Sequence, residues 1–211
     1  MEIPQDDILL FRKKIDSFHH LSDPSFQKFA TILHKKKYKK GEVILREGET
    51  CKGFWYIIKG CIRSFTVEDG LDINLTFYFD NEIASDFYSV RAKNPSKYFF
   101  IALEPCETLY FDQKETVELF SDDLEFIHFS FRFYQEKFLR ERSHSNIFKL
   151  MSPEERYQYV LHNQPHYLQR IPLTYLASYL GISRETLSRI RKKLWWLHFA
   201  SFDAVFRIRR F

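Results

Sequence analysis

Residues 173–190 have the composition and spacing of two short helices that cross at a sharp turn. The apolar residues recur at helical intervals on one side of each segment: Leu176, Leu180, Leu187 and Ile190. Ala177 is small where a second helix must approach closely, and Gly181 stands where the turn requires a positive φ. Ser183 suits the N-cap of the second helix. The segment predicts a helix-turn-helix, which can present its second helix to DNA.

The other side of the second helix carries side chains that suit contacts with DNA. Arg184, Glu185 and Arg189 fall in its first two turns, the part of a recognition helix that meets base edges. Arginine can donate two hydrogen bonds to guanine, and glutamate can accept one from cytosine. Lys192 and Lys193 are expected on phosphates. The candidate DNA-binding residues are Ser183, Arg184, Glu185, Thr186, Ser188, Arg189, Lys192 and Lys193. An ordinary helical hairpin with an i,i+4 ion pair between Glu185 and Arg189 is the alternative.

The charge distribution favours the same end of the chain. Residues 183–211 hold eight Lys or Arg and two Asp or Glu, so they carry +6 within a chain whose net charge is +4. A basic end on a slightly acidic body favours a polyanionic partner there. A solubilising tail would give the same imbalance.

The chain before the predicted helix-turn-helix divides into three segments that differ in the spacing of their apolar residues. Residues 6–35 show helical spacing, with a helix start predicted at Asp23-Pro24 and Asp23 as its cap. Residues 38–112 hold short apolar runs and five of the six glycines, which is typical of an all-β sandwich or barrel. Residues 113–145 return to helical spacing.

The last of these segments contains a heptad-like seam. Its members follow a 3-4-3-4 spacing: Leu124, Ile127, Phe131, Tyr134 and Phe138. Such a seam can pack against a second copy of itself. It can equally be the buried face of a helix within one chain.

Two further features lie near the C-terminal end. Ser152 followed by Glu155 is typical of a capping box, and the predicted helix runs to about Asn163. After the second helix of the predicted pair, residues 195–211 alternate in a way that suits one short strand over residues 205–210.

Residues 183–189, Ser-Arg-Glu-Thr-Leu-Ser-Arg, resemble the recognition helix of the Crp/Fnr family of bacterial transcription regulators. Residues 40–49 and 56–63 are similar to the opening strands of that family's cyclic-nucleotide-binding-type roll. The resemblance covers nearly the whole chain. It implies an α+β fold with an N-terminal antiparallel β-roll of the jelly-roll type, flanking helices, a long dimerisation helix and a C-terminal winged helix-turn-helix.

The resemblance also implies a division of the chain. We expect a β-roll sensor domain with N-terminal helices at residues 1–115, a dimerisation helix at 116–145 and a winged helix-turn-helix at 146–211. The family's wing is a β-hairpin, and residues 195–211 leave room for an abbreviated one.

The function implied is sequence-specific DNA binding by a transcription regulator. Its partners would be double-stranded DNA with an inverted repeat, a second copy of the chain and RNA polymerase. The alternative is a small-molecule-binding roll whose helix-turn-helix mediates protein interaction.

One departure from the family concerns the effector pocket. Nucleotide-binding members have Gly-Glu and, further on, Arg-Ser/Thr-Ala, which hold the phosphate. The aligned positions here are Ser85 and Asp86, then Ser96, Lys97 and Tyr98. Phosphate binding of this kind needs close backbone approach and a bidentate guanidinium. Ser96 lacks the guanidinium and Tyr98 adds bulk, so we expect a degenerate pocket with an unknown effector or none.

Other chemistry is disfavoured by residue counts. A metal-dependent enzyme built on the roll would need several histidines, and residues 41–112 contain none. An iron–sulfur cluster needs about four cysteines, whereas Cys51, Cys61 and Cys106 are three and dispersed. Cys61 and Cys106 are expected to be buried small residues. We expect no enzymatic activity, no cofactor and no metal.

Location follows from what the sequence lacks. No run approaches the roughly 20 apolar residues that span a bilayer, and the first residues are acidic rather than apolar. An odd number of cysteines without close spacing suits a reducing compartment. We expect a cytoplasmic protein without a membrane segment.

Overall fold

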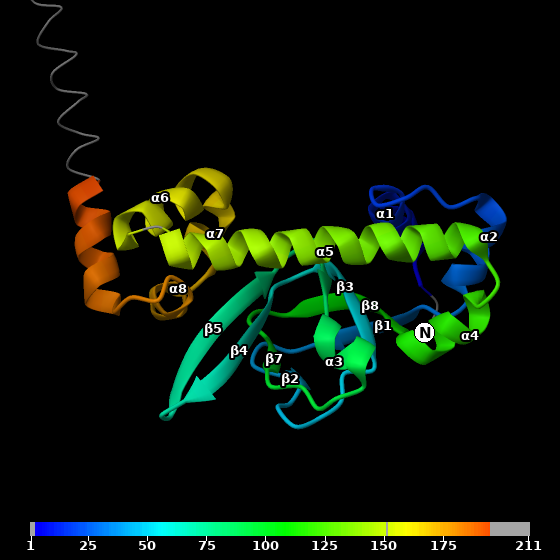
Figure 1. Ribbon diagram of the computed structural model, residues 1–211, viewed down its shortest axis with the longest axis horizontal. Coiled ribbons are helices and arrows are strands. Elements are labelled where there is room, and N and C mark those ends of the chain that lie inside the picture. The colour runs from blue at the N-terminus through cyan, green and yellow to red at the C-terminus, as the bar shows by residue number, and fades with distance from the viewer. Residues whose placement is uncertain (1–2, 151, 195–211) are drawn as a thin grey trace, which may run out of the picture. The chain divides into compact units, whose positions relative to one another are not determined.

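The computed structural model describes residues 3–150 and 152–194. The chain divides into two compact units, Met1–Glu141 and Arg142–Phe211. The N-terminal unit is a β-roll with helices packed against it, and the described part of the C-terminal unit consists of the end of a long helix followed by short helices (Figure 1). Within the described residues, no helix combines the length and the apolar character needed to cross a bilayer.

The roll of the N-terminal unit is made of two four-stranded antiparallel sheets, ordered β1-β8-β3-β6 and β2-β7-β4-β5. The strands are β1 (His34–Tyr38), β2 (Val43–Leu45), β3 (Gly53–Lys59), β4 (Ile62–Glu68), β5 (Leu71–Tyr78), β6 (Ile83–Ala84), β7 (Phe99–Ala102) and β8 (Cys106–Asp112). Most neighbouring strands are not consecutive in sequence, which is typical of a jelly roll. The predicted roll is confirmed. It begins at His34 rather than residue 38, because His34–Tyr38 pairs with β8.

The helices of this unit are α1 (Gln5–Asp16), α2 (Asp23–Ala30), α3 (Phe87–Ala92), α4 (Gln113–Phe120) and α5 (Leu124–Leu150), which continues into the second unit. Two details differ from the sequence expectation. The N-cap of α2 is Ser22 rather than Asp23. The single helix expected over 116–145 is divided, because Asp123 accepts a hydrogen bond from the Phe126 backbone N–H over 3.0 Å and starts a new helix.

Aromatic side chains join these helices to the roll. The Phe29 ring on α2 lies 5.2 Å from Phe111 on β8 and 5.3 Å from Phe126 on α5. Phe120 and Phe126 stack with centroids 3.9 Å apart, which packs α4 against α5. All four rings are buried. The three cysteines are buried free thiols, which confirms the expectation for Cys61 and Cys106.

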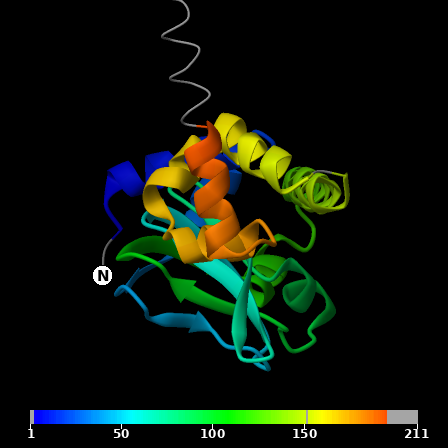
Figure 2. The same ribbon diagram turned by 90° about the vertical axis from the view of Figure 1, so that its left-hand side faces the viewer.

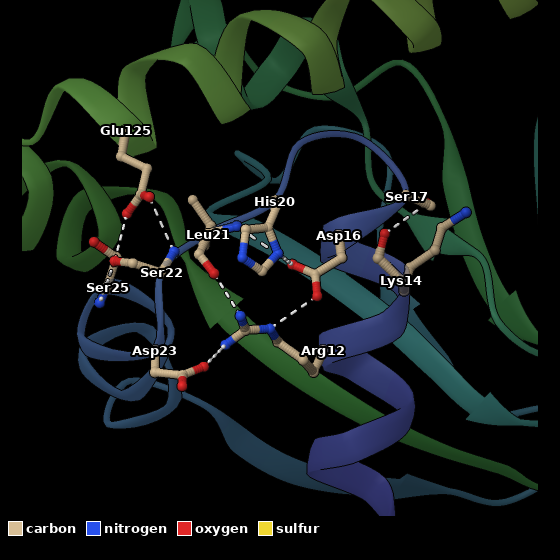
Figure 3. Close-up of polar contacts among 10 residues, drawn as sticks. All are labelled: Arg12, Lys14, Asp16, Ser17, His20, Leu21, Ser22, Asp23, Ser25 and Glu125. Atoms are coloured by element: carbon tan, nitrogen blue, oxygen red, sulfur yellow. Dashed lines mark hydrogen bonds and ion pairs between the residues drawn. The ribbon is translucent and has the colours of Figure 1, made fainter.

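Polar contacts fix the start of α5 to the N-terminal helices (Figure 3). The Glu125 carboxylate accepts hydrogen bonds from the Ser22 backbone N–H over 3.0 Å and from the Ser22 hydroxyl over 2.8 Å. Arg12 donates to Asp16 over 2.9 Å and to the Leu21 carbonyl. The segment between α1 and α2 is therefore tied both to α1 and to the first turn of α5.

The C-terminal unit contains α6 (Pro153–Asn163), α7 (Pro165–Arg170), α8 (Leu173–Tyr179) and a helix over residues 184–194, drawn in yellow and orange in Figure 2. The α6 start is the predicted capping box, with Ser152 and Glu155 bonded to each other's backbone N–H. The strand and wing expected within 195–211 lie outside the described residues.

Candidate functional site

The turn between α8 and the helix of residues 184–194 is closed by a Schellman motif. Gly181 has φ +65° and its N–H donates to the Ser178 carbonyl over 3.0 Å. The Ile182 N–H donates to the Ala177 carbonyl over 3.1 Å. These bonds satisfy the last carbonyls of α8 and need a residue that tolerates the left-handed conformation. Glycine at this position therefore ends α8 sharply, as the sequence predicted.

The inner faces of the two helices are buried as expected. The buried residues are Leu176, Ala177, Leu180, Leu187 and Ile190. Ser183 caps the second helix, because its hydroxyl accepts a hydrogen bond from the Thr186 backbone N–H over 3.1 Å. Local packing and capping thus fix which side of the 184–194 helix faces outward.

That outward side carries the residues proposed for DNA contact. The exposed residues are Ser183, Arg184, Glu185, Ser188, Arg189, Lys192 and Lys193, while Thr186 is half-buried. A hydrogen bond from its own backbone N–H, together with the nearby Arg184 charge, lowers the pKa of Glu185. The carboxylate is therefore ionised at neutral pH and can accept hydrogen bonds.

Arg189 does not form the ion pair with Glu185 that an ordinary helical hairpin would have. Its Nη2 donates a hydrogen bond to the Thr186 hydroxyl over 3.2 Å. Among residues 152–194, the structure shows no ion pair between Glu185 and Arg189. The i,i+4 pair that would occupy both side chains is absent from this described segment, and both charges lie exposed.

Two contacts from α6 to this helix pair were not predicted. Arg156 Nη1 donates to the Leu180 carbonyl over 2.8 Å, at the end of α8. Lys193 Nζ lies 2.8 Å from the Glu154 carboxylate. The Arg156 hydrogen bond stabilises the turn after α8. The Glu154 carboxylate pairs with Lys193, which the sequence analysis predicted to contact DNA phosphate. No local pattern announces either contact, because the partners are 24 and 39 residues apart.

The second candidate region is the part of the roll that aligns with the family's phosphate-binding motif. We call it the cassette, and its residues are Ser85, Asp86, Ser96, Lys97 and Tyr98. Asp86 caps α3, with its carboxylate accepting from the Ser89 N–H over 3.0 Å and from the Ser96 hydroxyl over 2.7 Å. The Ser96 hydroxyl also lies 3.0 Å from the Tyr98 carbonyl. Asp86 and Ser96 are both buried. The structure thus brings together two of the predicted pocket positions and bonds them to each other.

Neighbouring side chains extend this network in a way that the sequence did not reveal. The Ser85 hydroxyl donates to the Gly53 carbonyl over 2.9 Å and lies 3.6 Å from Cys51 Sγ. The Ser89 hydroxyl accepts from the Cys51 N–H over 2.9 Å and donates to the Asn94 carbonyl over 2.5 Å. Burial raises the pKa of the Cys51 thiol, so the sulfur stays uncharged.

These residues do not fit a cyclic nucleotide phosphate. The position aligned with the family's arginine is Ser96, whose hydroxyl donates to Asp86 and accepts from the Tyr98 backbone N–H. The buried Asp86 carboxylate would repel a second anion at the start of α3. Lys97 is exposed and Tyr98 half-buried, and a lysine supplies no bidentate fork.

Helix α5, which contains the predicted dimerisation seam, has a stripe of exposed apolar side chains. The exposed fractions are 72% for Leu124, 47% for Ile127, 66% for Phe131 and 65% for Phe138. Tyr134, the remaining seam residue, is half-buried against Phe133, with ring centroids 5.5 Å apart. The inward side of α5 is formed by other residues: Phe126, Phe129, Phe133 and Lys137. Four of the five seam residues are therefore not the buried face of an intramolecular helix.

Residues 35–123 match the family model of the cyclic nucleotide-binding domain. The matched segment ends at residue 123, and α5 begins at Leu124. No curated protein matches the chain. The chain is similar in structure to CLP of Xanthomonas campestris, described as a c-di-GMP-responsive global regulator. The TM-score is 0.64 at 17% identity, covering 82% of this chain and 91% of CLP.

Two further solved structures extend the likeness. FixK2 from Bradyrhizobium japonicum gives a TM-score of 0.66 at 16% identity, covering 79% of this chain and 86% of FixK2. The catabolite activator protein of Thermus thermophilus gives 0.54 at 21% identity, covering 86% of each chain. These neighbours are Crp/Fnr-type regulators, and at such identities the likeness shows the fold. Residues 35–123 of the chain, which match the cyclic nucleotide-binding domain model, form the roll within that fold.

Proposed function

We propose that this chain is a homodimeric, sequence-specific DNA-binding transcription regulator of the Crp/Fnr type. The observation that carries the proposal is the exposed side of the 184–194 helix. Arg184, Glu185 and Arg189 lie exposed in its first two turns, on a helix whose opposite side is buried. The structural likeness to a catabolite activator protein and to a global regulator supports the same function.

In this proposal the C-terminal unit reads base edges in the major groove. Arg184 and Arg189 donate to guanine, and the ionised Glu185 accepts from a cytosine amino group. Lys192 contacts phosphate, and Lys193 does so after leaving Glu154. Two-fold symmetry places the two recognition helices about 34 Å apart on an inverted repeat.

The dimer of this proposal forms through the apolar stripe of α5. Leu124, Ile127, Phe131 and Phe138 repeat at heptad spacing and are exposed in the single chain. Covering these side chains removes apolar surface from water, which stabilises association. Tyr134 borders the same seam from a half-buried position.

The roll of this regulator is not a cyclic nucleotide receptor. Its cassette is filled by hydrogen bonds among its own side chains, chiefly that between Ser96 and Asp86. We therefore expect the protein to bind its operator without a cyclic nucleotide in this cassette, with an unknown effector or none. We also propose RNA polymerase as a further partner and the cytoplasm as the location.

The test is selection of duplexes from a random pool by the purified protein with no added ligand. We expect an inverted repeat, and Arg189→Ala should relax selection at one base pair in each half-site, at a cost of about 1–3 kcal/mol. Affinity should fall by about 0.9 log units per log unit of salt for each phosphate contacted. Failure to retain any duplex, or a flat salt profile, would favour a helix pair that binds protein instead.

A further inference from the structure

The Thr186 hydroxyl links the start of the 184–194 helix to the Arg189 guanidinium. Arg189 Nη2 donates to Thr186 Oγ1 over 3.2 Å. Ser183 Oγ donates to the same oxygen over 3.1 Å, and the Thr186 backbone N–H donates to Ser183 Oγ over 3.1 Å. One run of hydrogen bonds thus connects the helix cap to the arginine across two helical turns.

Thr186 is a stiff support in this run. It is half-buried, whereas Ser183 and Arg189 are exposed. A β-branched side chain has few χ1 rotamers in a helix, and the Ser183 contact holds the hydroxyl further. Arg189 lies three residues further along, and helical side chains lean toward the N-terminus, so it reaches back over Thr186.

This arrangement restricts an otherwise flexible side chain before DNA arrives. Arginine loses much rotamer freedom when its guanidinium is fixed, and a side chain that is already held loses less on binding. The bond to Thr186 uses one of the five guanidinium N–H groups. The others remain available for the two acceptors on a guanine edge.

We infer that Thr186 is a positioning residue that sets the direction of the Arg189 guanidinium and so determines how sharply Arg189 discriminates its base pair. The inference rests on the proposed DNA-reading function. It replaces direct DNA contact by Thr186, which the sequence had suggested, with action through Arg189. A threonine that touched phosphate would instead strengthen binding to all duplexes alike.

The test compares Thr186→Val, which keeps the shape and removes the hydroxyl, with Thr186→Ser, which keeps the hydroxyl. Each is titrated with the selected duplex and with its single-base variants. We expect Thr186→Val to lose about fivefold in discrimination at one base pair per half-site. Its affinity for unrelated duplexes and its salt slope should not change, and Thr186→Ser should match the wild type. In an Arg189→Ala background, Thr186→Val should cause no further loss.

A measurement without DNA examines the same contact. Relaxation of the Arg189 Nε–H group, followed by nitrogen-15 NMR, should show an ordered guanidinium in the wild type and in Thr186→Ser. Thr186→Val should be more mobile. Equal order in all three proteins overturns the inference, and a thermal unfolding curve confirms that each variant is folded.

The outcomes separate this inference from the function on which it rests. A wild-type protein that retains no duplex overturns the proposed function and the inference with it. A wild-type protein that selects a duplex, with Thr186→Val discriminating equally well, overturns the inference alone. The same holds if Thr186→Val weakens every duplex by one factor.

Discussion

The Ser96 hydroxyl donates a hydrogen bond to the Asp86 carboxylate over 2.7 Å, in the segment that the sequence aligns with a phosphate-binding motif. Both side chains are buried, and Asp86 also caps α3. A carboxylate that is bonded at the start of a short helix already satisfies the donors that an anionic ligand would use. The cassette is therefore closed by the chain's own groups.

The Asp86–Ser96 bond should appear as a coupling in stability. Asp86→Ala removes a helix cap and leaves the Ser96 hydroxyl without its carboxylate, at a cost of about 1–3 kcal/mol in the free energy of unfolding. Ser96→Ala should cost less. Urea unfolding of both single variants and the double variant should give a coupling energy of about 0.5–3 kcal/mol. Strictly additive effects would show that the two side chains act independently.

Cyclic AMP should not stabilise the protein. A ligand that binds only the folded state raises its stability by RT ln(1 + [L]/Kd), and this cassette offers neither a guanidinium nor a vacant helix start. We expect the same thermal midpoint with and without millimolar nucleotide. A concentration-dependent rise would contradict the closed cassette, and the Asp86→Ala variant would then show whether the rise depends on that site.

Phe131 should be an anchor of the proposed dimer. Phe131→Glu puts a charge into the centre of the exposed α5 stripe, which we expect to weaken dimerisation by about 30-fold or more. Its side chain is 66% exposed in the single chain, so the folded monomer should retain its stability. Sedimentation equilibrium measures the association, and Arg132→Glu, also exposed, is the matched control. Equal association of the two variants would place the dimer interface elsewhere.

Glu154 should restrain DNA binding by holding Lys193. The ion pair spans 2.8 Å at the surface, and breaking such a pair costs about 0.2–1 kcal/mol. Glu154→Gln should therefore raise affinity for the selected duplex by about two- to fivefold at low salt. In a Lys193→Met background the gain should vanish. A gain that persists there would mean that Glu154 acts through general repulsion of the DNA.

The contact of Lys35 with two carboxylates should make stability depend on pH. Lys35 Nζ lies 2.6 Å from Asp7 and 3.0 Å from Glu107, joining α1, β1 and β8. Hydrogen bonds from Lys35 and then from Lys37 lower the pKa of Glu107, and bonds to Asp7 and Glu107 raise the pKa of Lys35.

The sign of each shift fixes the pH window. A lowered carboxyl pKa contributes stability above its unfolded value of about 4.3, and this is lost as pH falls through the folded value. A raised lysine pKa contributes below about 10.4 and is lost as pH rises through the folded value. Lys35→Met should therefore destabilise the protein at neutral pH, with a penalty that shrinks in acid.

Urea unfolding between pH 3 and pH 8 measures this dependence. Lys37→Met is the control, since Lys37 also contacts Glu107 but is 57% exposed, and a screened surface pair contributes little. A penalty for Lys35→Met that does not change with pH would show that lost packing, not charge, explains its effect.

The sequence by itself determined the helix pair and its outward face. Gly181, the Ser183 cap and the apolar positions Leu176 and Leu187 are read from helical periodicity and turn chemistry. Helical periodicity and turn chemistry each involve only a few neighbouring residues, so they do not depend on the path of the rest of the chain. The strands of the roll and the α6 capping box were predictable for the same reason.

Only the tertiary structure decided which distant groups meet. Glu125 bonds Ser22 from 103 residues away, and Lys193 finds Glu154 across 39 residues. The Asp86–Ser96 bond spans 10 residues, but a helix and a loop must turn back for it to form. Such contacts depend on how the loops and sheets bring distant segments together. The periodicity of apolar residues does not predict which distant segments meet. The side of α5 left exposed was likewise settled by packing, because a heptad seam suits a core or a partner equally.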